Sequence, residues 1–139
     1  MSLFNIFDVA GSGMSAQSVR LNTVASNLAN ADNLSGSAAQ AYRAREPVFK
    51  AIYSAPDGTS QSQVVGVKVS AIATSGAAIQ TRYMPGSPMA DKNGYVYGSN
   101  VNPIEEMVNM ISASRSYQND VQVLNTSKEM LLRTLTLGS

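Results

Sequence analysis

The sequence contains no cysteine and no histidine among its 139 residues. Without cysteine, neither a disulfide framework nor a thiolate metal site can form. Without histidine, the commonest general base, the Ser-His and Cys-His nucleophile pairs and the usual zinc ligands are also absent. We therefore expect a protein that is not an enzyme and that binds no cofactor and no metal.

Charge is scarce as well, since only 14% of the residues are charged and ten Lys and Arg nearly balance nine Asp and Glu. The basic residues are scattered, so the positive stripe that nucleic-acid binding requires is missing. A surface so poor in charge is unusual for a freely soluble monomer. It fits a protein whose surface is covered by other protein subunits.

Long apolar runs are also lacking. No run approaches the roughly 20 residues of a membrane span, so we expect no membrane insertion. No basic residue precedes the first apolar stretch, which Asp8 and Gly11 interrupt, so the pattern of a cleaved signal peptide is absent. A chain found outside the cytoplasm would have to leave by a route that reads no such signal.

The clearest positive feature is a helix predicted over residues 101–137. Asn102 can cap it, Pro103 suits the first helical position, and Glu105 can complete a capping box. No Gly or Pro follows until Gly138, so the helix is roughly 35 residues and on the order of 50 Å long. Alternating steps of three and four define a coiled-coil-type seam along it, which comprises Met107, Met110, Ser114, Tyr117, Val121, Leu124, Lys128, Leu131 and Leu135.

Residues 1–31 carry a second seam with the same alternation, which comprises Leu3, Phe7, Ala10, Met14, Gln17, Leu21, Val24, Leu28 and Ala31. Gly11, Ser12 and Gly13 lie inside it, and each glycine costs about 1 kcal/mol relative to alanine. We expect the first dozen residues to be frayed or bent unless something outside the chain holds them. The two terminal helices are expected to pack together as a stem.

The middle of the chain, residues 32–100, reads as a loop-rich β insertion with a small core. Pro47 indicates an edge strand or extended arm rather than a central strand. A turn is expected within 54–63, and residues 74–77 form the natural joint between two strands. The extended segments are predicted at 41–53, 65–73, 78–83 and 95–97. We thus predict a mainly α protein with a small β insertion, divided at 1–31, 32–100 and 101–139.

Three short motifs invite a chemical interpretation. Glu105 and Glu106 are adjacent carboxylates, but consecutive helical positions point about 100° apart, so a role beside the helix dipole is favoured over catalysis. The stretch 91–94 resembles a calcium loop but lacks the bidentate acidic ligand, so a turn is favoured. Gly11-Ser12-Gly13 is a flexible break rather than a phosphate loop, because no lysine follows.

Two further features leave alternatives open. Met107, Met110 and Met130 can fill a core or form an adaptable surface that meets several neighbours. Asn27 and Asn30 lie near the end of the first helix, where they can act as a plain helix stop or as a recognition corner.

The stretch Ser26-Asn27-Leu28-Ala29-Asn30-Ala31-Asp32 resembles the N-terminal signature of the bacterial flagellar axial proteins, which include rod, hook and hook-associated proteins. Ala31-Asp32-Asn33 replaces the commoner Asn-Thr-Gly corner of that family. Other stretches are similar to one branch only, the proximal-rod proteins: 42–45, 48–49, 83–88, 90–91, 94–96, 105–111, 114–117 and 124–126.

The resemblance implies an axial-type helical stem, a structural role and no cofactor. It implies export through the flagellar type III apparatus without a cleaved signal, and polymerisation into the drive shaft of the basal body, which crosses the periplasm. The implied partners are other copies of the chain, proximal and distal rod subunits, and the adaptor between rod and MS ring. The residues that match the family motif are Ser26, Asn27, Leu28, Ala29, Asn30, Glu106, Met107, Arg115 and Tyr117.

We expect the assembly contacts along both seams, at Leu3, Phe7, Met14, Leu21, Val24, Leu28, Met107, Met110, Tyr117, Val121, Leu124, Leu131 and Leu135. Arg115 either pairs across a subunit boundary or is simply exposed. The alternative function is a soluble coiled-coil adaptor or secretion chaperone that binds an amphipathic partner helix.

Overall fold

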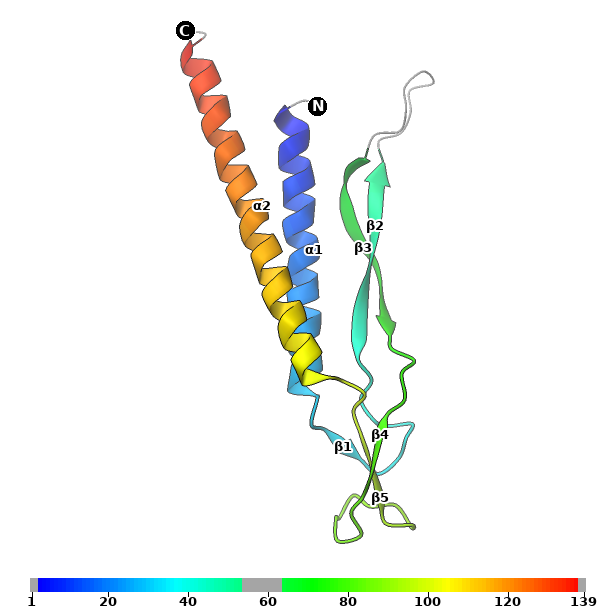
Figure 1. Cartoon of the computed structure of the whole chain (residues 1–139). Helices are drawn as coiled ribbons and strands as arrows, with labels where there is room; N and C mark the ends of the chain where they lie inside the picture. Colours follow the sequence, from blue (N-terminus) through cyan, green and yellow to red (C-terminus); the bar gives the residue numbers. More distant parts are fainter. Residues whose placement is uncertain (1–2, 54–63, 138–139) are drawn as a thin grey trace.

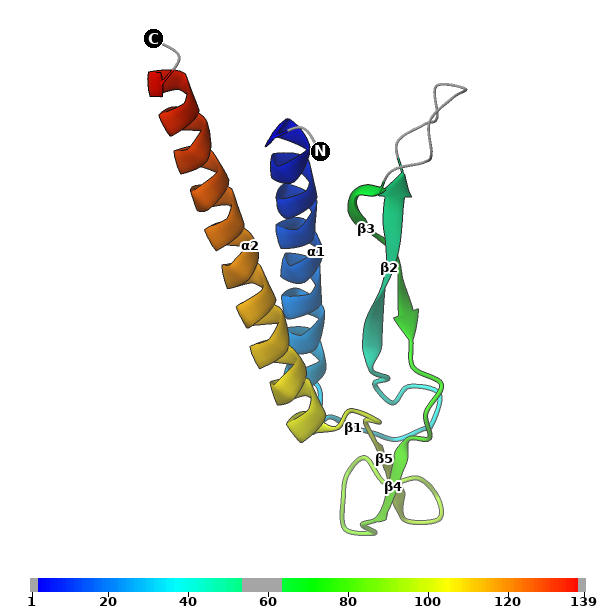
Figure 2. The ribbon, with the colours of Figure 1, turned by 45° about the horizontal axis from the view of Figure 1, so that its top comes forward.

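The computed structural model describes residues 3–53 and 64–137, and the turn predicted within 54–63 lies outside them. Two long helices, α1 (Leu3–Ala29) and α2 (Pro103–Leu137), lie side by side and run in opposite directions, with both termini at the same end (Figures 1 and 2). Between them come β1 (Leu34–Ser35), β2 (Arg45–Tyr53), β3 (Val64–Thr74), β4 (Gln80–Tyr83) and β5 (Tyr95–Gly98). The chain therefore combines two terminal helices with a small antiparallel β region, as predicted.

The start of α2 confirms its predicted cap. The Oδ1 atom of Asn102 accepts a hydrogen bond from the Ile104 amide at 3.1 Å, and Pro103 occupies the first helical position. The hydrogen bonds between described residues include none from the Glu105 side chain, so the second half of the predicted capping box is not formed.

The expected break at Gly11-Ser12-Gly13 is wrong, because α1 runs without interruption through all three residues. Contacts within the chain itself hold this stretch. The Ser12 Oγ accepts a hydrogen bond from the Val67 amide at 3.1 Å, which ties α1 to β3. A Cβ atom at Gly13 would lie only 2.8 Å from an oxygen of Asp120 on α2. Glycine at this position therefore permits close approach of the two helices.

The strands β2 and β3 form a long two-stranded antiparallel ribbon that runs beside α1 (Figures 1 and 2). Pro47 is tolerated because a two-stranded sheet leaves each strand a free edge, as predicted. As predicted, β3 and β4 are connected through residues 74–77, which nevertheless do not link two strands of one sheet. These residues lead from β3, which pairs with β2, to β4, which pairs with β5.

A second sheet has the strand order β1-β5-β4, and Val96 at its centre is fully buried. The predicted turn at 91–94 is present. Asp91 Oδ1 accepts hydrogen bonds from the Asn93 and Tyr95 amides at 2.8 and 2.9 Å, and the bond from Tyr95 is the main reason that the pKa of Asp91 is lowered. Gly94 has a φ of +83°, a conformation that side-chain-bearing residues rarely adopt. The two-residue β1 was not predicted.

The apolar core of a single chain is small. Among the described residues, the buried apolar side chains are only alanines and valines: Ala10, Ala16, Val24, Ala41, Ala44, Val96, Val101 and Ala113. Many larger apolar side chains are exposed, and the two most exposed of them, Ile104 and Leu135, lie on α2. Within the described part of the chain, no helix has the length and apolar character needed to cross a membrane.

Candidate assembly surface and the junction at its base

The face of α2 that packs on α1 differs from the predicted seam in half of its positions. Met110, Tyr117, Leu124 and Leu131 are half-buried, as their seam positions require. At four other positions the residue one place earlier also faces α1: Glu106, Ala113 and Ser127 are buried and Asp120 lies against Gly13, whereas Met107 and Lys128 are exposed and Ser114 and Val121 are half-buried. This face is therefore built from small and polar side chains as much as from apolar ones.

The other predicted seam residues fall into three groups. Ala10 and Val24 of α1 are buried, and the half-buried ones are Phe7, Met14, Gln17, Leu21, Leu28, Ala31, Ser114 and Val121. Met107 and Leu135 of α2 are 47% and 69% exposed, so a single chain leaves them largely uncovered. The side chain of Leu3 lies outside the described part. The role of these residues in assembly stays a prediction.

Close approach explains why small and polar residues line the contact between the helices. Asp120 lies against Gly13, and burial raises the pKa of its carboxyl group. The Arg20 Nη2 donates a hydrogen bond to Asn109 Oδ1 at 3.1 Å across the two helices. Gln17 has a buried side-chain oxygen without a hydrogen-bond partner. Such a contact gives less hydrophobic stabilisation than a seam of leucines would.

The side of α2 that faces away from α1 carries an exposed apolar patch, which we call the outer patch. It consists of Ile104, Val108 and Ile111, which are 72%, 62% and 57% exposed and which follow helical spacing. Arg115 lies one turn further along and is exposed. A shallow groove of about 390 Å³ joins Val108, Ile111 and Arg115. Exposed apolar patches of this kind are typical of protein-protein contact sites.

A second apolar groove lies where the first turns of α1 meet α2. Its volume is about 530 Å³, and Ile6, Val123 and Met130 provide its apolar walls. Met130 is 47% exposed. The sequence left open whether Met107, Met110 and Met130 fill a core or form an adaptable contact surface. Met107 and Met130 lie at the surface of the single chain, as a contact surface requires.

At the base of the helix pair, Asn27 joins three segments of the chain. It is only 1% exposed. Its Oδ1 accepts hydrogen bonds from the Arg45 amide at 2.9 Å and the Tyr42 hydroxyl at 3.0 Å, and its Nδ2 donates to the Arg45 carbonyl at 2.9 Å. A further hydrogen bond links it to Glu106 of α2. Asn27 therefore fixes the start of β2 against both helices.

Asn30 ends α1 by a local contact. Its Nδ2 donates to the Ser26 carbonyl at 2.7 Å, and its Oδ1 accepts from Asn33 Nδ2 at 2.7 Å. Asn30 thus bonds as the helix-stop interpretation requires, whereas Asn27 instead joins α1 to Tyr42 and Arg45. A recognition corner would need at least one of them to face outward with free hydrogen-bonding groups.

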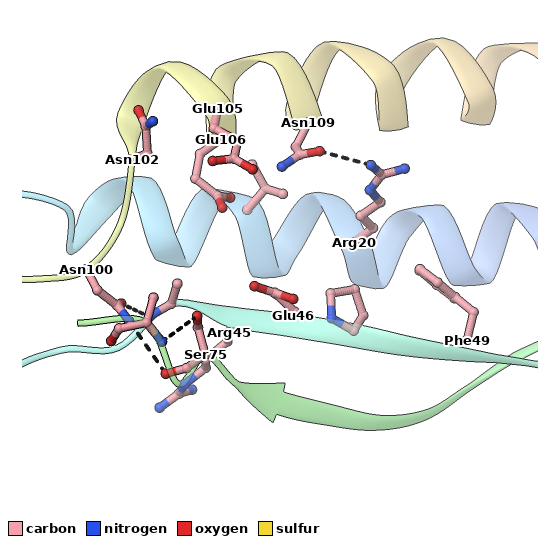
Figure 3. Close-up of a pocket in the computed structure, with 14 residues that line it drawn as sticks. Arg20, Arg45, Glu46, Phe49, Ser75, Asn100, Asn102, Glu105, Glu106 and Asn109 are labelled. Atoms are coloured by element: carbon pink, nitrogen blue, oxygen red, sulfur yellow. Dashed lines mark hydrogen bonds between the residues drawn. The ribbon is translucent and has the colours of Figure 1, made fainter. Parts of the chain in front are cut away.

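Beside this junction lies an open groove of about 620 Å³ between α1, β2 and the first turns of α2 (Figure 3). We call it the acidic groove, because Glu46, Glu105 and Glu106 line it. Asn100 shapes its floor, since its Oδ1 accepts from the Ala44 amide at 2.7 Å and its Nδ2 donates to the Ala77 carbonyl at 3.1 Å. Both connections hold the linker before α2 against the other strands.

Glu106 is the most unusual side chain in the acidic groove. It is 9% exposed, and its buried Oε2 has no hydrogen-bond partner. Burial is the main reason that its pKa is raised, and Glu105 and Glu46 add to the effect, whereas the bond from Asn27 and the charge of Arg20 oppose it. The sequence predicted a dipole role for Glu106 but not its burial. Its spacing gives a hint of this burial: Glu106 lies seven residues, or about two helical turns, before the buried Ala113, and therefore on the same face of α2.

The groove has no arrangement suited to a metal. Among the residues that the structure describes, no group of three or more His, Cys, Asp and Glu side chains could hold a metal ion.

Comparison with known protein families gives matches at both ends of the chain. Residues 7–36 match the family described as flagella basal body rod protein, and residues 92–137 match the C-terminal family of flagellar basal body rod FlgEFG proteins. The first match includes Asn27 but not its partners Tyr42 and Arg45, and the second covers α2 with the outer patch. The two families therefore coincide with the two packed helices.

Similar proteins match over nearly the whole length. A flagellar basal-body rod protein FlgC from Salmonella typhimurium is 52% identical over 138 residues, with 99% of both chains covered. A FlgC protein from Escherichia coli O6:H1 is 53% identical over the same share of both chains. One from Buchnera aphidicola of Baizongia pistaciae is 40% identical over 140 residues, again with 99% of both covered.

Proposed function

The chain belongs to the FlgC family of flagellar basal-body rod proteins, and from this we infer that it is a structural, non-enzymatic subunit of the rod. The similarity extends over 99% of the chain, so it includes both helices and the β region between them. The absence of histidine and cysteine from the sequence agrees with a structural role.

We propose that the subunit polymerises through its terminal helices into the proximal part of the drive shaft, where it transmits torque from motor to hook. The observation that carries this proposal is the outer patch on α2. Ile104, Val108 and Ile111 are more than half exposed although they lie on a long, regular helix. Helices of neighbouring subunits that pack on this face would form the coiled-coil stem and bury the patch.

The proposed partners are other copies of the chain, the proximal and distal rod subunits, and the adaptor between rod and MS ring. We place the subunit in the rod that spans the periplasm, reached through the flagellar type III export apparatus without a cleaved signal. The names of the FlgC relatives support the location in the basal-body rod.

A charge within the outer patch tests the proposal. Val108→Asp places a carboxylate at a position that is 62% exposed in the single chain. The isolated variant should therefore unfold like the wild type, within about 0.5 kcal/mol. In a strain that lacks its own copy of the protein, the wild-type chain should restore motility and be recovered in purified basal bodies, whereas Val108→Asp should do neither.

Asn125→Asp is the matched control, because Asn125 is an exposed polar residue of the same helix outside the patch. It should behave like the wild type in both assays. Leu124→Asp and Leu131→Asp should also block assembly, but both leucines are half-buried within the chain, so these variants also weaken the helix pair. Normal motility with Val108→Asp would contradict assembly through the outer face of α2.

A further inference from the structure

Glu106 combines two properties that a folded chain rarely keeps together. Its side chain is nine-tenths buried, and its Oε2 has no hydrogen-bond donor. A buried carboxylate oxygen without a donor is unfavourable, and folding alone does not remove that cost. The Glu106 side chain lines the acidic groove, but this oxygen is covered in the single chain, so a donor from outside the chain would reach it once the carboxylate turns toward the groove. The position therefore points to a ligand that brings hydrogen-bond donors and positive charge.

The two arginines that line the groove, Arg20 and Arg45, do not donate a described hydrogen bond to the Glu106 carboxylate. Arg20 donates its hydrogen bond to Asn109 at 3.1 Å. The guanidinium of Arg45 lies 5.9 Å from the centre of the Tyr42 ring, and Figure 3 shows it pointing away from Glu46 and Glu106. Three carboxylates and two guanidinium groups therefore line the groove, and the described contacts of the guanidinium groups are with Asn109 and Tyr42 rather than with the carboxylates.

The same helix presents a guanidinium on another side. Arg115 is exposed at the end of the outer patch and makes no hydrogen bond with any described residue. Its neighbours in the shallow groove include Val108 and Ile111, which would exclude water from a contact made there. Arginine is enriched at the energetic centres of protein interfaces, and its planar group of donors matches a carboxylate.

We propose that the acidic groove of one subunit receives the Arg115 guanidinium of a second copy, with the carboxylate of Glu106 as the acceptor. This proposal rests on the proposed function and adds a specific contact between subunits. The acidic groove and the outer patch lie on different sides of α2, so the contact joins two unlike surfaces. A head-to-tail contact of this kind does not close on itself and generates a helical assembly.

The absence of cysteine from the chain allows a clean crosslinking test. Glu105→Cys marks the rim of the acidic groove and Ser112→Cys marks the groove beside Arg115, so both Glu106 and Arg115 remain intact. The two variants, with different tags, are expressed together in a strain that lacks its own copy. A short bismaleimide should then join one variant to the other in purified basal bodies.

Pairing Glu129→Cys with Ser112→Cys is the control, because Glu129 is exposed on α2 far from the groove. Crosslinking no stronger than in this control would overturn the proposal. So would a crosslink from Glu105→Cys to a different rod protein. If the wild-type chain is absent from basal bodies, the proposed function itself has failed. If the chain is incorporated without a crosslink, only the proposed contact has failed.

A second variant tests the role of the carboxylate. Glu106→Gln keeps the size and shape of the side chain and removes its charge. We expect the crosslink yield to fall about tenfold or more, since removal of one partner from a desolvated charge pair weakens binding strongly. The unfolding midpoint of the isolated variant should be unchanged or higher. Glu129→Gln should leave the yield at the wild-type level, and an unchanged yield with Glu106→Gln would overturn the pairing.

Discussion

Asn27 shows how much of this fold depends on one polar side chain. Removal of the side chain in Asn27→Ala would leave the amide and carbonyl of Arg45 and the hydroxyl of Tyr42 without their present partners. Each buried group left unsatisfied costs about 1–3 kcal/mol, so we expect a loss of about 2 kcal/mol or more in the free energy of unfolding. Urea denaturation of the monomeric chain measures this loss.

Asn33→Ala is the control for that measurement. Asn33 is exposed and its side chain bonds only to Asn30, so its removal should cost less than about 0.5 kcal/mol. Equal losses in the two variants would contradict a special role for the Asn27 junction.

Glu106 gives a pH dependence whose sign follows from its burial. Its pKa in the folded chain is raised above the ordinary value of 4.5. The protonated form is thus favoured on folding, so the contribution of Glu106 to stability is greatest below 4.5 and is lost as pH rises through the folded pKa. The charges that face it are Glu105, Glu46 and Arg20.

The Glu106→Gln variant isolates this effect, because glutamine does not titrate in that range. The difference in unfolding free energy between variant and wild type should grow in favour of the variant as pH rises from acid toward neutral. Denaturation curves at several pH values measure the difference. A difference that is constant with pH would show that Glu106 does not titrate with a raised pKa.

At the scale of the element, the two glycines of α1 allow a matched comparison. A Cβ atom at Gly11 would meet nothing within 4 Å, whereas one at Gly13 would lie 2.8 Å from an oxygen of Asp120. Gly11→Ala should therefore stabilise the chain by about 0.5–1 kcal/mol through helix propensity alone. Gly13→Ala should gain less or lose stability, because the carboxylate must move.

A double variant checks the cause. If the Asp120 side chain accounts for the difference, Gly13→Ala should recover the gain when it is combined with Asp120→Ala. The interaction energy in a double-mutant cycle measures this recovery. Equal effects of Gly11→Ala and Gly13→Ala in the wild-type background would mean that the two helices do not approach closely at Gly13.

The elements themselves were largely predictable, and their packing was less so. Asn102 and Pro103 marked the start of α2, and alternation in 65–73 marked β3. The seam register failed at Glu106 and Asp120, because an apolar pattern alone assumes that large side chains face the neighbouring helix of the same chain. Here Val108 and Ile111 face outward instead.

The pairing of the strands and the junction needed the tertiary structure. No local signal distinguishes a ribbon of β2 with β3 from a hairpin of β3 with β4, because turn-type residues both precede and follow β3 in the sequence. Asn27 was recognised as part of a signature, but its partners at Tyr42 and Arg45 are distant enough in sequence that spacing could not reveal them.

For the whole molecule, the distribution of buried side chains distinguishes a part that packs within the single chain from a part that the single chain leaves exposed. The base of the helix pair has Asn27, the buried Val24 and the strands around Val96. At the other end of the helix pair, the C-terminal part of α2 is largely exposed to solvent. From Lys128 to Thr136, only Leu131 of α2 is even half-buried. A subunit of this kind gains much of its final stability from its neighbours, since packing rather than propensity stabilises most helices in proteins.

This division predicts a gradient of hydrogen exchange along α2. In dilute monomer, amides at 106–120 should exchange slowly because that stretch packs on α1, whereas amides at 128–137 should exchange at close to the rates of an unfolded chain. In purified rods the second stretch should become protected. Mass spectrometry of pepsin fragments resolves the two stretches, and the unassembled Val108→Asp variant serves as the monomer reference. Uniformly slow exchange across both stretches of the dilute monomer would mean that α2 needs no neighbour to be stable, and the case for assembly as the source of its stability would fail.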